Sequence, residues 1–376
     1  MLKQAAAALL AAMMVTAVQT APSLPPEISA KAAVVIEAET RRVLYQSNAQ
    51  EQLPMASTTK IMSALLALEH PALEKEFVVD AAAIHVEGSS MGLREGDSVT
   101  MYALACGMLL SSGNDAANAA AVAMCGNISG FVLRMNERAQ QLGLENTRFA
   151  NPSGLDAEGH YTTAYDMACL AAFALENERF AEICSQSNMR VRYGNPPYDR
   201  WLDNHNRLVD SYEGCIGVKT GFTSKARRCL VSAAERDGVR LICVTLNDPD
   251  DWRDHTALFD YGFALYKSVS IDTDLDGAVV PVAGGDTIRL PVVTSGQANA
   301  VLSENELKGL ERRILAPPVL FAPVAKGQVV GSVEYITDGI TVKTLPLYAA
   351  QDIKYKENPT LWARIARLFG STSEET

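Results

Sequence analysis

The chain of 376 residues contains no C-x-x-C and no H-E-x-x-H pattern. Cysteine or histidine pairs at these spacings mark the common zinc sites, so we expect neither a metal nor a cofactor. Its seven cysteines are an odd number, so at least one is unpaired or pairs between chains. Because most lie in apolar surroundings, we expect buried, small apolar side chains, with a bridge between Cys106 and Cys125 as the alternative.

Positively charged residues are also fewer than negatively charged ones. The chain has 33 lysines and arginines against 44 acidic residues, which gives a net charge of -11. This balance makes nucleic acid an unexpected partner. A hydrophobic content of 48% supports real cores, and the length suits two domains better than one.

The N-terminal apolar run is too short to cross a membrane comfortably. Residues 5–18 are apolar apart from Thr16 and follow a single positive charge at Lys3. A transmembrane helix needs about 20 apolar residues. We therefore expect a secretory signal peptide at residues 1–21 and an exported protein, with an uncleaved anchor as the alternative.

The most informative stretch is Ser57-Thr58-Thr59-Lys60, which opens into an apolar, helix-forming run. Residues three apart on a helix share a face, so Ser57 and Lys60 are expected to point the same way. A neutral lysine amine can activate a serine hydroxyl, provided that the site lowers the lysine pKa from about 10.4. The alternative is an ordinary helix start with Ser57 as the N-cap.

Two further motifs favour catalysis over a helix cap. Ser112-Gly113-Asn114 follows an apolar run, and Lys219-Thr220-Gly221 lies inside a strand-like one. The order S-x-x-K, S-x-N and K-T-G is typical of penicillin-binding proteins and class A β-lactamases, which are serine acyl-transfer enzymes. The sequence therefore predicts a serine acyl-transfer site.

The hydrophobic pattern predicts an α/β (α+β) fold in which helices cover an antiparallel sheet. Strands are expected at residues 31–37, 42–45, 215–222, 229–234 and 240–246. Helices are expected from Ser57 onward and at residues 102–110, 116–124, 130–142, 163–176 and 252–266.

The hydrophobic pattern of the sequence changes after Lys267. Residues 272–350 have short runs of valine, isoleucine and leucine between turn residues, which predicts a small all-β domain. Residues 358–370 form a last helical pattern with one apolar face and arginines elsewhere. This pattern is typical of an amphipathic membrane-surface helix, and packing on the chain's own β domain is the alternative. The apolar face consists of Leu361, Trp362, Ile365, Leu368 and Phe369.

Residues 27–263 resemble the low-molecular-mass penicillin-binding proteins, the serine-type D-alanyl-D-alanine carboxypeptidases. Beyond the three motifs, residues 112–117, 131–136, 147–155 and 229–234 carry the resemblance. It implies a β-lactamase/transpeptidase-like catalytic domain at residues 27–267. It also implies a location on the outer face of the cytoplasmic membrane.

The resemblance also implies residue roles. Ser57 would attack the carbonyl between two D-alanines of the peptidoglycan stem peptide, and β-lactam antibiotics would acylate the same serine. Lys60 would take its proton, and Ser112 would relay one to the leaving amine. The backbone N–H groups of Ser57 and Phe222 would hold the oxyanion. Removing one such donor typically costs about 10²–10³ in rate.

The same resemblance implies a substrate-binding set. Asn114 would bind the substrate amide, Thr220 its terminal carboxylate, and Gly221 would leave room for its backbone. Lys219 would support the site electrostatically and lower the pKa of Lys60. Arg253 is a candidate carboxylate-binding residue, with a solvated helix start as the alternative. His205 is expected to be structural, and lining the cleft is the alternative.

Three other hypotheses remain at this point. Residues 88–92 match G-x-S-x-G but lack the preceding strand and following helix of a nucleophile elbow. A β-lactamase shares the three motifs, although no class-A-like Glu-x-x-x-Asn loop follows S-x-N. A catalytically decayed wall-binding module is the third, and the intact motifs argue against it.

Overall fold

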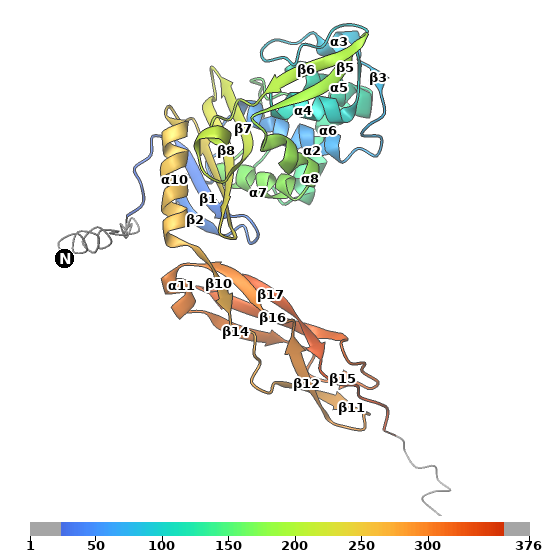
Figure 1. Ribbon diagram of the computed structural model, residues 1–376, viewed down its shortest axis with the longest axis vertical. Helices are drawn as coiled ribbons and strands as arrows, with labels where there is room; N and C mark the ends of the chain where they lie inside the picture. The colour runs from blue at the N-terminus through green and yellow to red at the C-terminus, as the bar shows by residue number, and fades with distance from the viewer. Residues whose placement is uncertain (1–23, 357–376) are drawn as a thin grey trace, which may run out of the picture. The chain divides into compact units, whose positions relative to one another are not determined.

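The computed structural model describes residues 24–356 and divides into two compact units (Figure 1). Unit 1 comprises the described residues up to Arg236 together with Arg240–Leu265. Unit 2 comprises Asp237–Val239 and the described residues from Tyr266 onward. The predicted signal peptide and the predicted helix at residues 358–370 lie outside the described residues.

Unit 1 is built on a five-stranded sheet in the order β2-β1-β9-β8-β7. β1 pairs with both β2 and β9, and β7 pairs with β8, and all of these pairs are antiparallel, as predicted for the sheet. The pairing of β1 with the distant β9 was not predicted. Helix α10 packs on one face, and α2, α7 and α8 pack on the other (Figure 1). All of β1 is buried because both faces are covered. The strands are β1 (Ala32–Glu37), β2 (Val43–Ser47), β7 (Cys215–Thr223), β8 (Arg227–Arg236) and β9 (Val239–Leu246).

The predicted helices are present with small shifts at their ends. Thr163 caps α7, since its hydroxyl accepts a hydrogen bond from Asp166 N at 3.0 Å. Among the described residues, no single helix is long and apolar enough to span a membrane, and α5 and α6 qualify only as a pair bent by 89°. The helices are α2 (Lys60–Leu68), α4 (Met101–Leu109), α5 (Asn114–Cys125), α6 (Ile128–Gln141), α7 (Ala164–Leu175), α8 (Glu178–Cys184), α10 (Asp251–Leu265) and the short η1 (Ala56–Thr59), α3 (Ala81–Ile84) and α9 (Leu208–Ser211).

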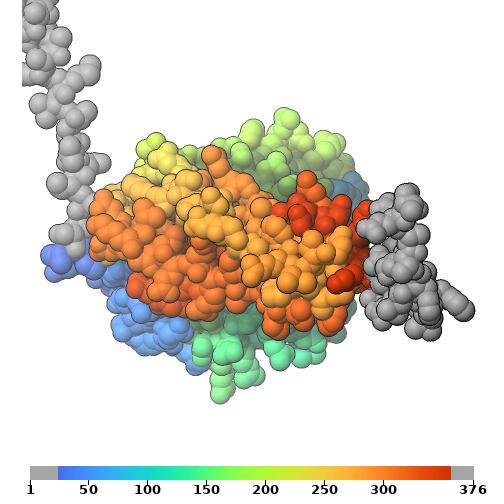
Figure 2. Space-filling view, turned by 90° about the horizontal axis from the view of Figure 1, so that it is seen from below, coloured from blue at the N-terminus to red at the C-terminus, as the bar shows by residue number. Residues whose placement is uncertain are grey.

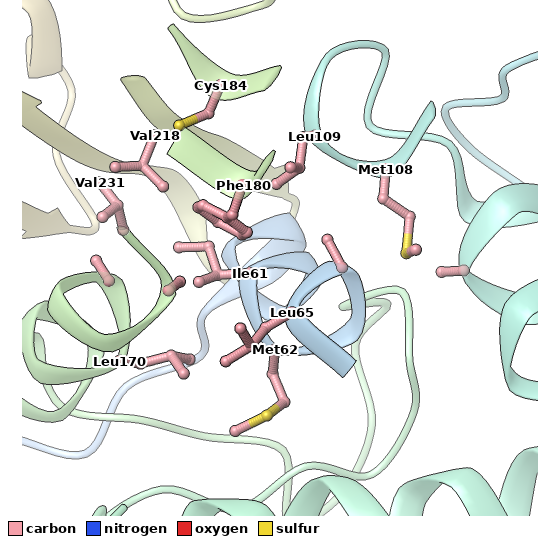
Figure 3. Packing of buried hydrophobic residues seen from close by; sticks show 14 of the residues in the cluster. Ile61, Met62, Leu65, Met108, Leu109, Leu170, Phe180, Cys184, Val218 and Val231 are labelled. Carbon is pink, nitrogen blue, oxygen red and sulfur yellow. The ribbon is translucent and has the colours of Figure 1, made fainter. Parts of the chain in front are cut away.

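Helix α2 is the centre of the unit 1 core. Every residue of α2 is buried, including Lys60 at its start. Figure 3 shows Ile61 and Leu65 of α2 among Phe180 of α8, Leu109 of α4 and other apolar side chains. Because a close-packed core tolerates little displacement, this packing fixes the start of α2 in place.

A second, four-stranded sheet in unit 1 was not predicted. It has the order β3-β4-β5-β6, with β3 (Phe77–Val78), β4 (Ser98–Val99), β5 (Asn188–Gly194) and β6 (Pro197–Asp203). β5 and β6 form a hairpin that is mostly exposed and carries Arg192 opposite Asp199. β5 does alternate Met189, Val191 and Tyr193 with arginines. On β6, however, Arg200 lies opposite Val191 and Trp201 is 66% exposed, so the second strand breaks the alternation.

The cysteines behave as small apolar residues. All seven are free, and six of them are buried. The alternative of a bridge between Cys106 in α4 and Cys125 in α5 is therefore wrong.

Unit 2 confirms the expectation of an all-β architecture, with one short helix added. A six-stranded sheet has the order β14-β16-β17-β12-β11-β15, and β10 pairs with β13 in a separate ribbon. It has its own apolar core, which includes Leu290, Val333 and Leu347. Its surface is drawn in orange and red in Figure 2. Its elements are β10 (Lys267–Ile271), β11 (Val279–Ala283), β12 (Arg289–Thr294), β13 (Ala298–Leu302), α11 (Glu304–Lys308), β14 (Glu311–Leu315), β15 (Leu320–Phe321), β16 (Val329–Thr337) and β17 (Ile340–Ala349).

Helix α6 offers a matched test of the core. Phe131 is fully buried, whereas Leu133 on the same helix is 66% exposed. We expect Phe131→Ala to cost about 3–5 kcal/mol of unfolding free energy, because it removes buried contacts and leaves a cavity. Leu133→Ala should stay within about 0.5 kcal/mol of the wild type. Urea unfolding measures both, and equal effects would contradict the packing described here.

Candidate active site

The first motif sits on η1 and the start of α2. Ser57 lies in the 3₁₀ turn of η1, and Lys60 is the first residue of α2. In a 3₁₀ helix residues three apart eclipse one another, so the two side chains meet. Lys60 Nζ lies 2.9 Å from Ser57 Oγ. Ser57 is not an N-cap, since η1 begins before it, and the helix-cap alternative is wrong.

The Lys60 amine has two further partners, and both are carbonyl oxygens. Nζ donates to Asn114 Oδ1 at 2.6 Å and to the Ser153 carbonyl at 2.5 Å. A neutral amine has two N–H donors and one lone pair. Because both carbonyl oxygens can only accept, they use the two N–H groups. In the neutral amine, the remaining lone pair is then left for the Ser57 hydroxyl.

The charge environment favours the neutral amine. Burial lowers the pKa of Lys60 well below its usual value, and the nearby charge of Lys219 lowers it further. The Asp115 carboxylate acts weakly in the opposite direction on this pKa. Burial also lowers the pKa of Lys219 to about 7. The geometry and the pKa shift of Lys60 therefore both suit a general base.

The second motif lies between α4 and α5. Asn114 Nδ2 donates to the Glu87 carbonyl at 2.6 Å, which fixes its amide so that Oδ1 faces Lys60. Both ends of this amide are thus engaged inside the protein. These contacts give Asn114 a role in orienting Lys60. One N–H and one lone pair of the amide are left, so the substrate-amide contact that the resemblance implied stays a prediction. Ser112 lines the cleft beside Ser57, with a left-handed backbone at φ 56°.

The loop that holds Asn114 contains the rejected G-x-S-x-G stretch. Residues 85–97 form neither helix nor strand, so the nucleophile elbow is excluded as predicted. The Asp115 carboxylate instead accepts hydrogen bonds from Ser90 Oγ at 2.6 Å and from the backbone N–H of Met91 at 2.9 Å. Ser89 from this loop lines the cleft together with Ser57, which the sequence analysis did not foresee.

The third motif lies on β7, an edge strand of the five-stranded sheet. Lys219 is buried, and its Nζ donates to the Thr220 carbonyl at 2.9 Å. A Cβ on Gly221 would lie 3.0 Å from Ser57 N. The missing side chain therefore lets β7 approach the backbone of η1. This close approach was not foreseen. Room for the substrate stays a prediction, and Gly221 does line the cleft.

Residues 147–155 form another wall of the site, although the sequence analysis gave them no role. Ser153 supplies the carbonyl that binds Lys60. A Cβ on Gly154, whose φ is +91°, would lie 2.0 Å from the carbonyl oxygen of Ala56. Only glycine fits this position, because both the space and the backbone conformation exclude a side chain. In the sequence, the Ser153-Gly154 pair within residues 147–155 was the feature that could have predicted this wall.

These elements enclose a cleft of about 490 Å³ in unit 1. Among the residues expected at the site, Ser57, Ser112, Thr220, Gly221 and Phe222 line it. His205 also lines it, so the expectation of a purely structural histidine is wrong. Arg207, Arg228, Asp251 and Trp252 complete one side and were not predicted.

Arg253 is not brought into this cleft. Its guanidinium pairs with Asp254 at 2.9 Å and with Asp250 at 3.3 Å. It sits near the start of α10 with its side chain 61% exposed, which matches the solvated alternative. Arg228, which does line the cleft, donates to Asp251 Oδ1 at 2.5 Å.

Comparisons with known proteins agree with this geometry. Residues 17–250 match the peptidase S11 model, described as D-alanyl-D-alanine carboxypeptidase. Residues 269–355 match the C-terminal domain of penicillin-binding protein 5. The D-alanyl-D-alanine carboxypeptidase DacF of Bacillus subtilis is 34% identical over 86% of this chain and 86% of its own length.

Two further relatives support the assignment. The D-alanyl-D-alanine carboxypeptidase DacC of Escherichia coli is 30% identical over 88% of this chain and 85% of its own length. The crystal structure of penicillin-binding protein 5 from Haemophilus influenzae superposes with a TM-score of 0.72 at 27% identity, and covers 89% of this chain and 100% of that one. This chain therefore belongs to the peptidase S11 family of serine-type D-alanyl-D-alanine carboxypeptidases.

Proposed function

We propose that this enzyme removes the terminal D-alanine from peptidoglycan stem pentapeptides through an acyl-enzyme on Ser57. The observation that carries the proposal is the buried Lys60 amine, which lies 2.9 Å from Ser57 Oγ and within hydrogen-bond distance of two carbonyl oxygens. β-Lactam antibiotics would acylate the same oxygen and inhibit the enzyme covalently. The S11 membership supports this reaction over the β-lactamase and the decayed module.

Each step of the reaction has a group to serve it. Lys60 takes the hydroxyl proton as Ser57 Oγ attacks the penultimate carbonyl carbon. The backbone N–H groups of Ser57 and Phe222 stabilise the oxyanion. As the C–N bond breaks, the proton passes from Lys60, with Ser112 as relay, to the leaving D-alanine amine. Water then hydrolyses the ester and releases the shortened peptide.

The substrate would bind in extended form against the free edge of β7. An edge strand presents unpaired backbone donors and acceptors, which suit strand addition by a peptide. Thr220 would bind the terminal carboxylate within a cleft whose lining carries the cation Arg207 and the ion pair of Arg228 with Asp251. Gly221 would act by bringing β7 close to Ser57, and Lys219 by keeping the pKa of Lys60 low.

We further propose an extracytoplasmic location at the membrane. Residues 1–21 would be the signal peptide, residues 27–267 the catalytic domain, and residues 272–350 the β domain. Residues 358–370 would lie in the membrane surface through their apolar face, with Arg364 and Arg367 on the polar side. The extracytoplasmic site of peptidoglycan chemistry supports this arrangement.

The nucleophile can be tested with two serine variants. We expect Ser57→Ala to abolish covalent labelling by a fluorescent penicillin and to reduce D-alanine release from a D-Ala-D-Ala pentapeptide by several orders of magnitude. Ser90→Ala, which alters the rival motif, should still become labelled. Labelling that survives Ser57→Ala would overturn the assignment.

The electrostatic role of Lys219 predicts a change in pH dependence. Acylation needs the neutral Lys60 amine, so its rate falls as pH drops through the pKa of Lys60. Lys219→Met removes a neighbouring positive charge, and the pKa of Lys60 should rise. The acidic limb of the penicillin acylation profile should then move to higher pH. Lys225→Met, an exposed control, should leave it in place.

The membrane role of the C-terminal segment needs a separate test. Deleting residues 361–376 should release the mature protein from sedimented membranes, because the apolar face is removed. Penicillin labelling should persist, since the deletion spares unit 1. If the truncated protein sediments with membranes as strongly as before, residues 361–376 are not the anchor.

A further inference from the structure

One face of unit 2 leaves apolar side chains uncovered across five neighbouring strands, β15, β11, β12, β17 and β16. We call this surface the outer band. Phe321 is 74% exposed, Val329 58%, Val293 48% and Val279 46%. Pro281 and Tyr348 complete the outer band.

The strand register places these residues on one face. Val293 pairs with Tyr348, and Tyr348 pairs in turn with Val329. Phe321 lies opposite Ala283, two residues along β11 from Pro281. Successive side chains of a strand point to opposite faces. The intervening residues Val280, Val282, Leu290, Val292 and Leu347 are buried in the unit 2 core, so the outer band faces away from it.

A cation lies beside the outer band. Arg289 pairs with Pro281 and lies on the same face. Farther along β16 and β17 this face turns polar, with Ser332 opposite Pro346 and Glu334 opposite Thr344. The apolar surface thus lies mainly at one end of the sheet, and Leu315 of β14, 42% exposed and paired with Ser332, is at its margin. A bounded exposed apolar patch marks an interaction surface.

The chain leaves the described part of unit 2 beside this patch. Lys356 N donates to the Gly284 carbonyl at 2.9 Å, and Ala322 N donates to the Ala283 carbonyl at 3.0 Å. The exit is therefore next to Phe321. From Lys356 to Leu361 an extended chain spans at most about 17 Å. A membrane-surface helix at residues 358–370 would hold this end of unit 2 within that distance of the lipid.

We propose that the outer band lies against the lipid surface and forms a second membrane contact on unit 2, with Arg289 at the anionic headgroups. This inference rests on the proposed membrane location. Peripheral binding increases with the apolar area buried and with attraction to anionic lipid. The outer band adds apolar area, and Arg289 adds attraction to anionic lipid. A second contact would also fix the orientation of unit 2 on the bilayer, whereas a single helix would leave the unit free to rotate.

The test compares two variants of the full mature chain on vesicles of phosphatidylethanolamine and phosphatidylglycerol. The band variant carries Phe321→Ser, Val329→Ser and Val279→Ser. The control carries Leu307→Ser and Ile340→Ser, which are 43% and 48% exposed outside the outer band. We expect the band variant to cosediment about tenfold more weakly, while the control binds as the wild type does. Penicillin labelling of both variants reports that unit 1 is intact.

Three results would overturn this inference. Unchanged vesicle binding by the band variant would mean that lipid does not cover the outer band. Stronger binding would indicate that the chain's own residues 357–376 cover it instead. Loss of a dimer in sedimentation velocity, with vesicle binding unchanged, would assign it to a second copy of the chain. None of these outcomes bears on Ser57, whereas failure of the truncation to release the protein would remove the proposed anchor itself.

Discussion

The site depends on how one buried amine is satisfied. Lys60 lies in a core that excludes water, where a charged ammonium would be costly. The oxygens around it are two carbonyl acceptors and the hydroxyl of Ser57. This set matches a neutral amine, with two donors and one lone pair. Burial and the charge of Lys219 favour the neutral amine, and in that state the two carbonyl acceptors leave the lone pair for the hydroxyl that is to be activated.

The scaffold keeps those oxygens in place from separate parts of the chain. The core around α2 fixes the backbone of Lys60 (Figure 3). Asp115 holds the loop whose Glu87 carbonyl orients Asn114. Gly154 lets the wall that carries Ser153 lie directly on Ala56. Each support is backbone-mediated or buried, so the amine stays aligned without a flexible partner.

Much of the fold follows from the sequence. The strands of the main sheet and the long helices show strong hydrophobic periodicity, and they are where the pattern predicts them. The β5–β6 hairpin was not predicted, because β6 breaks the alternation that β5 shows: Arg200 lies opposite Val191, and Trp201 is exposed. The exposed apolar face of unit 2 was not predicted from the sequence either. Val279 and Val293 look like core residues until the strand register shows which face they occupy.

The sequence by itself determined the chemistry. A serine and a lysine three residues apart, followed by S-x-N and K-T-G, define an acyl-transfer site, because few other residue sets activate a serine with an amine. Tertiary structure alone decided the remaining roles. Arg253 pairs with Asp254, and His205 lines the cleft. Gly221 lets β7 lie close to the backbone of η1. These outcomes depend on contacts between distant segments, and no local pattern encodes which atoms will be neighbours.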